Sequence, residues 1–295
     1  MRLLFIAIIV GLILLFGLLW WYRPIPVPVA PPPIEITPRP NPESQVIGRS
    51  VEGRAIEAYT YRSANQVATP SDPQKHLVFV GGIHGGYEWN SVLLAQTFMD
   101  YLEAHLELIP DNLLITIIPA ANPDGVYRVV GKEGRFTAAD VSTTGPLGLG
   151  RFNANEVDLN RNFDCRWRAE STWREQTVSA GTAPFSEPES RAIRDFVLAH
   201  RPTAMIFWHS QANAVYASAC EDGILPETRA VMKAYSQATG YPAIDSFDSY
   251  SVTGGAEDWL ASIGVPAITV ELKTHETVEW EKNLLGIKAL LEYYK

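Results

Sequence analysis

Two histidines and a glutamate stand where side chains of an α/β protein commonly do chemistry. His84 follows the apolar run HLVFVGG (76–82) in a glycine-rich turn, and Glu88 comes four residues later at the expected start of a helix. His209 ends a second apolar run, TAMIFWH (203–209). Polar side chains at the ends of the strands of an α/β sheet line the usual active crevice. Two imidazoles and one carboxylate leave a fourth position of Zn²⁺ open, which is typical of a catalytic zinc site.

Another acid lies in an apolar strand. Glu271 is the only ionisable residue of VPAITVEL (265–272). A carboxylate in such surroundings must be paired, bound to a metal or protonated, because burying its charge unpaired is costly. Partial burial raises the pKa of a carboxyl group toward the range in which it can take a proton from water. The sequence therefore indicates Glu271 as a candidate general base.

Strand-like and helix-like runs alternate along the chain and must position these residues. The expected strands are 76–82, 112–120, 203–209 and 265–272, and the expected helices are 89–105, 186–200, 226–239 and 278–294. This alternation predicts an α/β fold: a single domain with a central mixed, mostly parallel twisted sheet covered by helices on both faces.

Two long loops and two local motifs complete this outline. Residues 131–151 and 164–185 are expected to be loops. Ser186 and Glu189 have capping-box spacing, which predicts a helix start there. NPDG (122–125) is expected to form a turn in which Asp124 accepts hydrogen bonds.

Composition limits the classes of partner. The chain has 295 residues, 46% of them hydrophobic, which is enough for one sizeable core. Its formal net charge is −9, and no stripe rich in lysine and arginine occurs. We therefore expect no nucleic-acid partner. The two cysteines, Cys165 and Cys220, allow at most one internal disulfide, and the sequence leaves open whether it forms.

The first residues predict a membrane anchor. Residues 3–22 are uncharged and almost wholly apolar, long enough for a helix that spans a bilayer. Residues 24–42 contain nine prolines and should form an extended spacer. We expect an uncleaved transmembrane anchor at 1–23, a Pro-rich linker at 24–43 and a catalytic domain at 44–295. The catalytic domain is expected on the extracytoplasmic side of the cell membrane.

A series of short motifs extends over nearly all of the expected catalytic domain, residues 44–295. In chain order they are IGRSVEGRAI (47–56), the His84–Glu88 pair, NPDG (122–125), VDLNRNF (157–163), FSEPES (185–190), GGAEDW (254–259) and ITVEL (268–272). In order and spacing they resemble the zinc carboxypeptidases of the carboxypeptidase A type (peptidase family M14). The resemblance runs from about Val46 to Leu272.

The resemblance implies roles for the residues named above. His84, Glu88 and His209 correspond to the ligands of one zinc ion per chain, and Glu271 corresponds to the general base. The family usually places two residues between the first histidine and the glutamate, whereas this chain has three. The glycine pair after His84 could absorb the extra residue.

Further positions match the family's substrate-binding residues. Asn160 and Arg161 correspond to the pair that holds the terminal carboxylate of the substrate, and Tyr250 to a tyrosine that covers its last residue. A guanidinium suits a carboxylate because it can donate two parallel hydrogen bonds. Arg151 is favoured as the residue that stabilises the oxyanion, with Arg135 as its competitor.

The implied function is zinc-dependent hydrolysis of a C-terminal peptide bond, by a metallocarboxypeptidase whose catalytic domain is monomeric. Glu257 corresponds to the floor of the pocket for the terminal side chain, where an acid favours basic residues. One alternative is a peptidoglycan hydrolase that cleaves γ-D-glutamyl-diaminopimelate bonds in a muropeptide, since diaminopimelate also carries a side-chain amine. Another is a zinc deacylase or an inactive zinc-binding envelope protein. Glu271 argues against inactivity, and Arg161 with Tyr250 argues against a deacylase.

Overall fold

The fold is described from a computed structural model that covers residues 41–63, 74–142 and 147–295. Residues 40–295 form one compact unit. The predicted anchor and nearly all of the predicted linker lie outside the described residues. Within the described ranges, no helix has the length and apolar character needed to cross a membrane.

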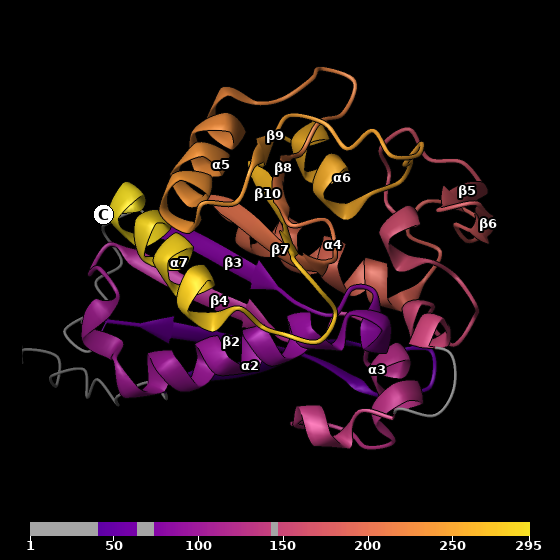
Figure 1. The fold of residues 1–295 in the computed structure, drawn as a ribbon, viewed down its shortest axis with the longest axis horizontal. Helices are drawn as coiled ribbons and strands as arrows, with labels where there is room; N and C mark the ends of the chain where they lie inside the picture. Colours follow the sequence, from indigo (N-terminus) through magenta and orange to yellow (C-terminus); the bar gives the residue numbers. More distant parts are fainter. Residues whose placement is uncertain (1–40, 64–73, 143–146) are drawn as a thin grey trace, which may run out of the picture. The chain divides into compact units, whose positions relative to one another are not determined.

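A mixed eight-stranded sheet forms the centre of the unit (Figure 1). In spatial order its strands are β1 (Glu43–Arg49), β2 (Ala55–Arg62), β4 (Leu113–Ile118), β3 (Lys75–Val80), β7 (Ala204–Ser210), β10 (Ala267–Leu272), β8 (Ala214–Ala217) and β9 (Ala243–Ile244). The four central strands, from β4 to β10, are parallel, while β1, β2 and β8 pair antiparallel with their inner neighbours. The carboxyl ends of the central strands therefore meet at one edge.

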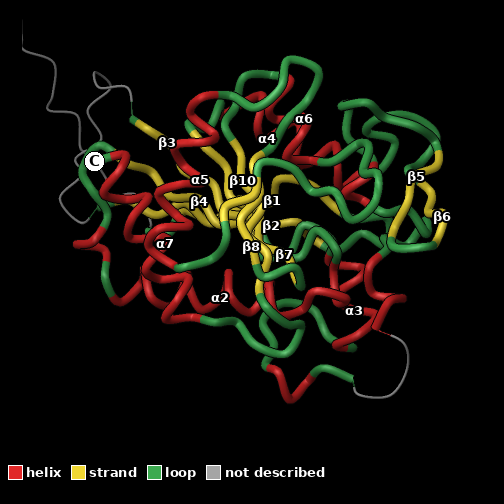
Figure 2. Tube along the Cα trace, turned by 45° about the horizontal axis from the view of Figure 1, so that its top comes forward, coloured by secondary structure: helices red, strands yellow, loops and turns green. Residues whose placement is uncertain are grey.

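Helices cover both faces of this sheet (Figure 2). One apolar layer lies under α2 (Trp89–Ala104), α5 (Pro226–Thr239) and α7 (Trp280–Tyr294). The other lies under α4 (Pro188–His200) and α6 (Ala256–Ser262). Successive strand residues alternate between the layers: Leu77 and Phe79 belong to the first, and Val78 and Val80 to the second. Continuous apolar runs such as HLVFV thus reflect burial on both faces, as the sequence predicts.

Local structure departs from the predicted outline at three points. The expected turn at NPDG instead opens a helix, α3 (Pro123–Val130), because the Asn122 side chain accepts a hydrogen bond from the backbone N–H of Gly125. The expected capping box before α4 is not formed: the helix begins at Pro188 after Glu187, and the Ser186 hydroxyl donates to that Glu187 carboxylate. The third departure is in the expected loop 164–185.

That loop contains a small hairpin of β5 (Glu170–Trp173) and β6 (Gln176–Ser179). The expected loop 131–151 likewise includes short 3₁₀ turns at Ala138–Asp140 and Leu147–Arg151. Cys165 and Cys220 form a disulfide, which ties the start of the hairpin loop to the segment after β8. This answers the question that the sequence leaves open.

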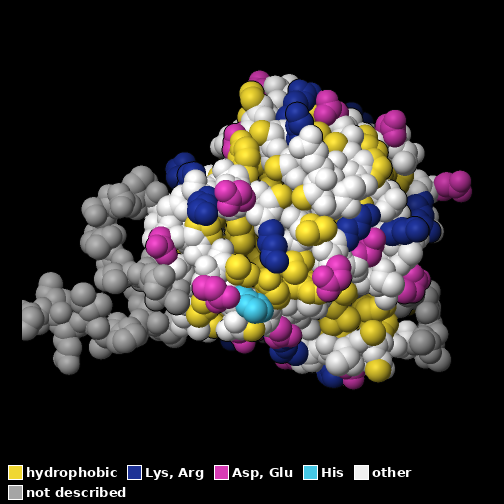
Figure 3. All heavy atoms as spheres, turned by 60° about the vertical axis from the view of Figure 1, so that its left-hand side comes forward, with side chains coloured by type: hydrophobic (Ala, Val, Ile, Leu, Met, Phe, Trp, Pro, Cys, Tyr) yellow, Lys and Arg dark blue, Asp and Glu magenta, His cyan; other side chains and the backbone are white. Residues whose placement is uncertain are grey.

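Acidic and basic side chains are interspersed on the face of the molecule seen in Figure 3. No extended patch of either sign dominates that view. This agrees with the composition, which gives no basic stripe.

Candidate metal centre

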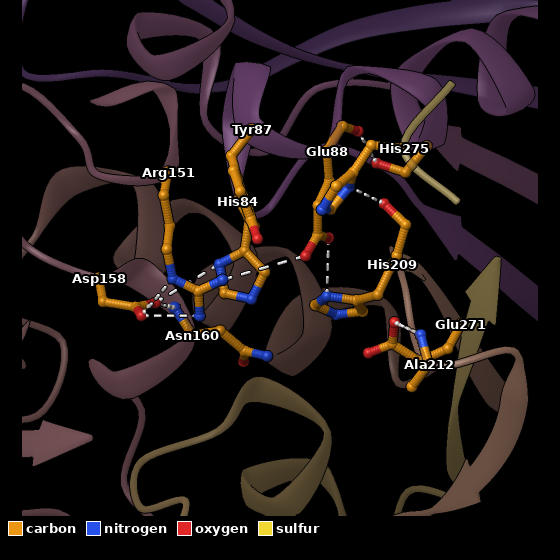
Figure 4. A network of polar contacts seen from close by, with 12 residues as sticks. His84, Tyr87, Glu88, Arg151, Asp158, Asn160, His209, Ala212, Glu271 and His275 are labelled. Carbon is orange, nitrogen blue, oxygen red and sulfur yellow. Dashed lines mark hydrogen bonds and ion pairs between the residues drawn. The ribbon is translucent and has the colours of Figure 1, made fainter. Parts of the chain in front are cut away.

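His84, Glu88 and His209 converge at the edge where the central parallel strands end. Each offers a ligand atom, and these atoms all lie within 4.8 Å of one another. The two imidazole centroids are 4.9 Å apart, and Nδ1 of His209 is 3.0 Å from Oε2 of Glu88. Figure 4 shows the three side chains pointing toward a common centre. All three are buried.

The wider spacing between His84 and Glu88 has a local explanation. Residues Gly85–Glu88 form one 3₁₀ turn, η1, which carries the glutamate back to the side of the histidine. Gly85 has a φ of +49°, and a Cβ atom there would come within 2.4 Å of the Gly150 carbonyl oxygen. Only glycine suits both that conformation and that close approach. The glycine pair thus accommodates the additional residue.

The donor set fits zinc. Two imidazole nitrogens and one carboxylate oxygen are ordinary zinc ligands, and three protein ligands are the usual number at a catalytic zinc. Within the described part of the chain, Nδ1 of His84 is buried without a hydrogen-bond partner, and Oε2 of Glu88 is buried with only the contact to Nδ1 of His209. Buried polar atoms without partners are rare in proteins, and a metal would satisfy them.

The electrostatics of the two imidazoles differ. Burial, together with the charge of Arg151, keeps the pKa of His84 well below its ordinary value, so this ring is a neutral lone-pair donor. Burial also disfavours a charged His209, but the carboxylates of Glu88 and Glu257 outweigh it and raise the pKa of His209 well above its ordinary value. The two carboxylates thus favour a positive charge here, which a proton or a metal ion can supply.

Glu271 lies beside this cluster because of strand pairing. It is the register partner of His209 on the adjacent parallel strand. Its Oε2 accepts a hydrogen bond of 3.1 Å from the backbone N–H of Ala212 (Figure 4). Burial raises the pKa of Glu271 to about 7. A carboxylate of this basicity is well suited to accept a proton near neutral pH.

Arg151 and Arg135 lie in different places. Arg151 is buried and forms an ion pair with Asp158, with Nη2 at 2.8 Å, and its Nη1 is 4.0 Å from Glu88 Oε1. Asp158 also faces His84, at 3.5 Å from Nδ1. Arg135 instead forms an exposed pair with Asp100. Of the two candidates, only Arg151 is adjacent to the candidate metal ligands.

Arg161 is a buried cation that lacks a carboxylate partner among the residues that the structure describes. Its Nη1 and Nη2 donate to the backbone carbonyls of Asn160 and Thr172, and its Nε has no partner within the described ranges. Nor does any carboxylate of those ranges form an ion pair with it. Because an uncompensated buried charge is costly, the site favours an anion beside this side chain. Asn160 itself accepts from the backbone N–H of Ala256, which joins this segment to the start of α6.

All of the favoured site residues line one cavity of about 530 Å³. They are His84, Glu88, Arg151, Asn160, Arg161, His209, Tyr250, Glu257 and Glu271. Tyr250 is half-buried and packs edge-to-face on Phe247, with ring centroids 4.9 Å apart. The structure thus gathers these residues from segments that are far apart in the sequence.

Glu257 lines the cavity but is buried and also contacts His209. Its Oε1 is 2.9 Å from Nε2 of His209 and also accepts a hydrogen bond of 3.2 Å from the Thr269 hydroxyl. Burial opposes ionisation of Glu257, but the hydrogen bond with His209 outweighs it and lowers the pKa of Glu257. This residue is therefore a buried, ionised carboxylate in contact with a candidate metal ligand.

Several residues around the cluster do not emerge from the sequence reasoning. Tyr87 packs against Trp173 of the hairpin and against His275, and its hydroxyl accepts a hydrogen bond from Arg174. The His275 side chain meets Ser210, the residue after His209, at 2.6 Å. The sequence gives only weak signals for these residues. Trp173 and Arg174 lie in the expected loop 164–185, and His275 follows a strand without belonging to a recognisable motif.

Comparisons with known proteins agree with this geometry. Residues 40–287 match the profile of the family described as zinc carboxypeptidase (peptidase M14). The chain is 27% identical over 221 residues to γ-D-glutamyl-L-diamino acid endopeptidase 1 of Lysinibacillus sphaericus, covering 67% of this chain and 54% of that protein. It is 29% identical over 250 residues to carboxypeptidase B of Helicoverpa zea, covering 76% and 56%. The chain thus spans little more than half the length of these relatives.

A solved structure shows a similar fold. The murein-tripeptide amidase MpaA from Escherichia coli O157 superposes with a TM-score of 0.59 at 21% identity. The match covers 88% of this chain and 96% of that one. At this identity the likeness concerns the fold.

Proposed function

The chain belongs to the zinc carboxypeptidase family, and on this premise we propose that it is a zinc-dependent carboxypeptidase that removes the last residue of a peptide. One observation carries the proposal: the guanidinium of Arg161, which forms no ion pair with any described residue, shares a cavity with the His84–Glu88–His209 cluster. A free carboxylate on the substrate would neutralise this cation. Binding there places the adjacent peptide bond within the same cavity.

The residues of the cavity then divide the chemistry. Zinc held by His84, Glu88 and His209 would polarise a carbonyl and acidify a water molecule. Glu271 accepts the proton from the attacking water and returns it to the leaving amine. Arg151, fixed by Asp158, donates hydrogen bonds to the oxygen on which negative charge develops, a contribution commonly worth a few kcal/mol.

The substrate's terminal residue is held by other groups. Asn160 and Arg161 bind its carboxylate, with the guanidinium donating two hydrogen bonds to it. Tyr250 covers the bound residue from the segment that precedes α6. We retain a preference for basic terminal residues as a prediction.

A substrate panel tests this proposal. Peptides ending in Lys and in Phe are incubated with the protein, with and without a chelator and with zinc restored. We expect release of the terminal residue that stops with the chelator and returns with zinc. Preferential release of Lys supports the predicted preference for basic terminal residues, and release of Phe but not Lys contradicts it. Zinc uptake without hydrolysis of any substrate would favour the inactive zinc-binding alternative.

A second function, cleavage of γ-D-glutamyl bonds in peptidoglycan peptides, is supported by additional arginines in the cavity, which lie there beside several carboxylates. Two further arginines, Arg166 and Arg174, line it in addition to Arg151 and Arg161. A γ-linked D-glutamyl residue carries a free α-carboxylate on the same residue as the scissile bond, so such a substrate brings more anions than an ordinary peptide. The name of the Lysinibacillus relative specifies a bond of this kind. Faster cleavage of a γ-D-glutamyl-diaminopimelate peptide than of both α-peptides would establish this alternative.

Residues 1–43 also bear on where the protein is located in the cell. We propose that they anchor the catalytic domain to the outer side of the cell membrane, on the strength of their apolar and Pro-rich composition. Retention of the full chain in membranes after alkaline extraction, with the domain accessible to added protease in intact cells, is the expected result. Release into the soluble fraction would contradict it.

A further inference from the structure

The buried carboxylate of Glu257 contacts the ring nitrogen of His209 that is turned away from Glu88. Nδ1 of His209 is 3.0 Å from Oε2 of Glu88, whereas its Nε2 is 2.9 Å from Oε1 of Glu257. The Glu257 and His209 side chains are only 7% and 2% exposed. The two ring nitrogens therefore face two different carboxylates.

With zinc bound to Nδ1, this arrangement favours the tautomer of His209 that carries its hydrogen on Nε2. A histidine that binds a metal through Nδ1 needs a lone pair on that nitrogen, so its hydrogen must be on Nε2. Oε1 of Glu257 is placed to accept that hydrogen. A carboxylate that accepts a hydrogen bond from a ligating imidazole orients the ring and makes it a better ligand.

The position of Glu257 is itself fixed by contacts outside the ligand set. The Thr269 hydroxyl of β10 donates to the same Oε1. Gly254, just before α6, has a φ of +69°, and a Cβ atom there would come within 2.1 Å of the Arg161 carbonyl oxygen. The backbone N–H of Ala256, the first residue of α6, donates to Asn160. The first turn of α6 is thus held against the site, and Glu257 with it.

We propose that Glu257 is a positioning residue for the metal ligand His209, and that its main effect is on zinc affinity rather than on the choice of the terminal side chain. The inference depends on the proposed zinc site. It assigns Glu257 a role different from the one that the family resemblance implies, because its Oε1 contacts Nε2 of His209 and accepts a hydrogen bond from Thr269.

Zinc affinity measured on the full chain tests the inference. Metal-free wild-type protein, Glu257→Gln and Glu257→Leu are titrated with Zn²⁺ in competition with a chromophoric chelator. Loss of such a contact typically weakens metal binding about 10- to 100-fold. We expect weaker binding in both variants, with the larger loss in Glu257→Leu. Glu257→Gln has the same shape as the wild type, so it keeps the test valid if Glu257→Leu fails to fold.

Asp258→Asn is the matched control. Asp258 is the next residue of α6, but its carboxylate accepts from the backbone N–H of Ala219 and pairs with Arg166 instead of His209. This variant should bind zinc with wild-type affinity. Equal weakening in Asp258→Asn and Glu257→Gln would indicate a general effect of charge on α6 and would overturn the inference.

Substrate selectivity separates the two possible roles of Glu257. The ratio of kcat/KM for Lys- and Phe-terminated peptides is measured at saturating zinc for the wild type and Glu257→Gln. We expect the ratio to be unchanged. Wild-type zinc affinity in Glu257→Gln, with or without a lower Lys/Phe ratio, would overturn the inference and leave the proposed function intact. Failure of the wild type itself to bind zinc would instead refute the proposed function.

Discussion

Glu271 and His209 are register partners on the adjacent parallel strands β10 and β7. Paired residues of neighbouring strands point to the same face of a sheet, so the candidate base and a candidate metal ligand emerge side by side. Their relative position therefore depends on hydrogen-bonded backbone rather than on a loop. A rigid support of this kind is what an acid–base group needs to meet its substrate in a constant geometry.

Replacement of the base should separate catalysis from metal binding. We predict that Glu271→Gln lowers kcat/KM by at least about 10²-fold, because a general acid–base residue typically contributes 10²- to 10⁴-fold. Zinc affinity should be retained, because Glu271 is not one of the three converging ligand residues. Steady-state kinetics and a zinc titration on the same preparation measure both. The control is Glu276→Gln, an exposed residue nearby, which should keep wild-type activity. Near-normal turnover by Glu271→Gln would refute its assignment.

The pH dependence of activity should report the same carboxylate. Burial raises the pKa of Glu271 to about 7, and only the ionised form can accept a proton. Activity should therefore rise with pH and level off above the pKa, falling about tenfold per unit on the acid side. The positive charge of bound zinc favours the carboxylate, so we expect the midpoint at or below pH 7. A profile of kcat/KM from pH 5 to 9 measures it, and higher activity at acidic pH would contradict the prediction.

Arg161 should distinguish a free terminal carboxylate from a blocked one. We predict that wild-type protein cleaves a free-acid peptide faster than the same peptide with a C-terminal amide. Hydrogen bonds to charged groups contribute about 1.5–3 kcal/mol, which corresponds to roughly a 10- to 150-fold preference in kcat/KM. Arg161→Met should abolish most of it, whereas Arg135→Met, at an exposed ion pair, should not. Equal loss of activity on both substrates would argue against this role.

Zinc should stabilise the folded protein, because the three ligands come together only in the folded state. At a free zinc concentration 100 times the Kd, the expected gain in the free energy of unfolding is about 2.7 kcal/mol. Differential scanning calorimetry should show a higher Tm with zinc than with a chelator. His84→Asn should abolish most of the increase without changing the secondary structure measured by circular dichroism. An unchanged Tm in the wild type at saturating zinc would contradict the proposed centre.

Much of the architecture could be predicted because its signals are local. The four expected strands became β3, β4, β7 and β10, the parallel centre of the sheet, since strands buried on both faces appear as continuous apolar runs. The outer strands of the sheet, β1, β2, β8 and β9, and the hairpin β5–β6 were not expected. Their residues lack strong periodicity, and their pairing depends on distant partners.

The sequence by itself determined which residue types stand at the ends of the central strands, and hence that His84, His209 and Glu271 meet at one edge. Only the tertiary structure decided which neighbours each of them has. It placed Arg151 rather than Arg135 beside the ligands, joined Cys165 to Cys220, and brought Glu257 against His209. The reason is physical: strand ends follow from local hydrophobic patterns, whereas contacts between segments tens of residues apart depend on the paths of the intervening loops and on how α6 packs against the sheet.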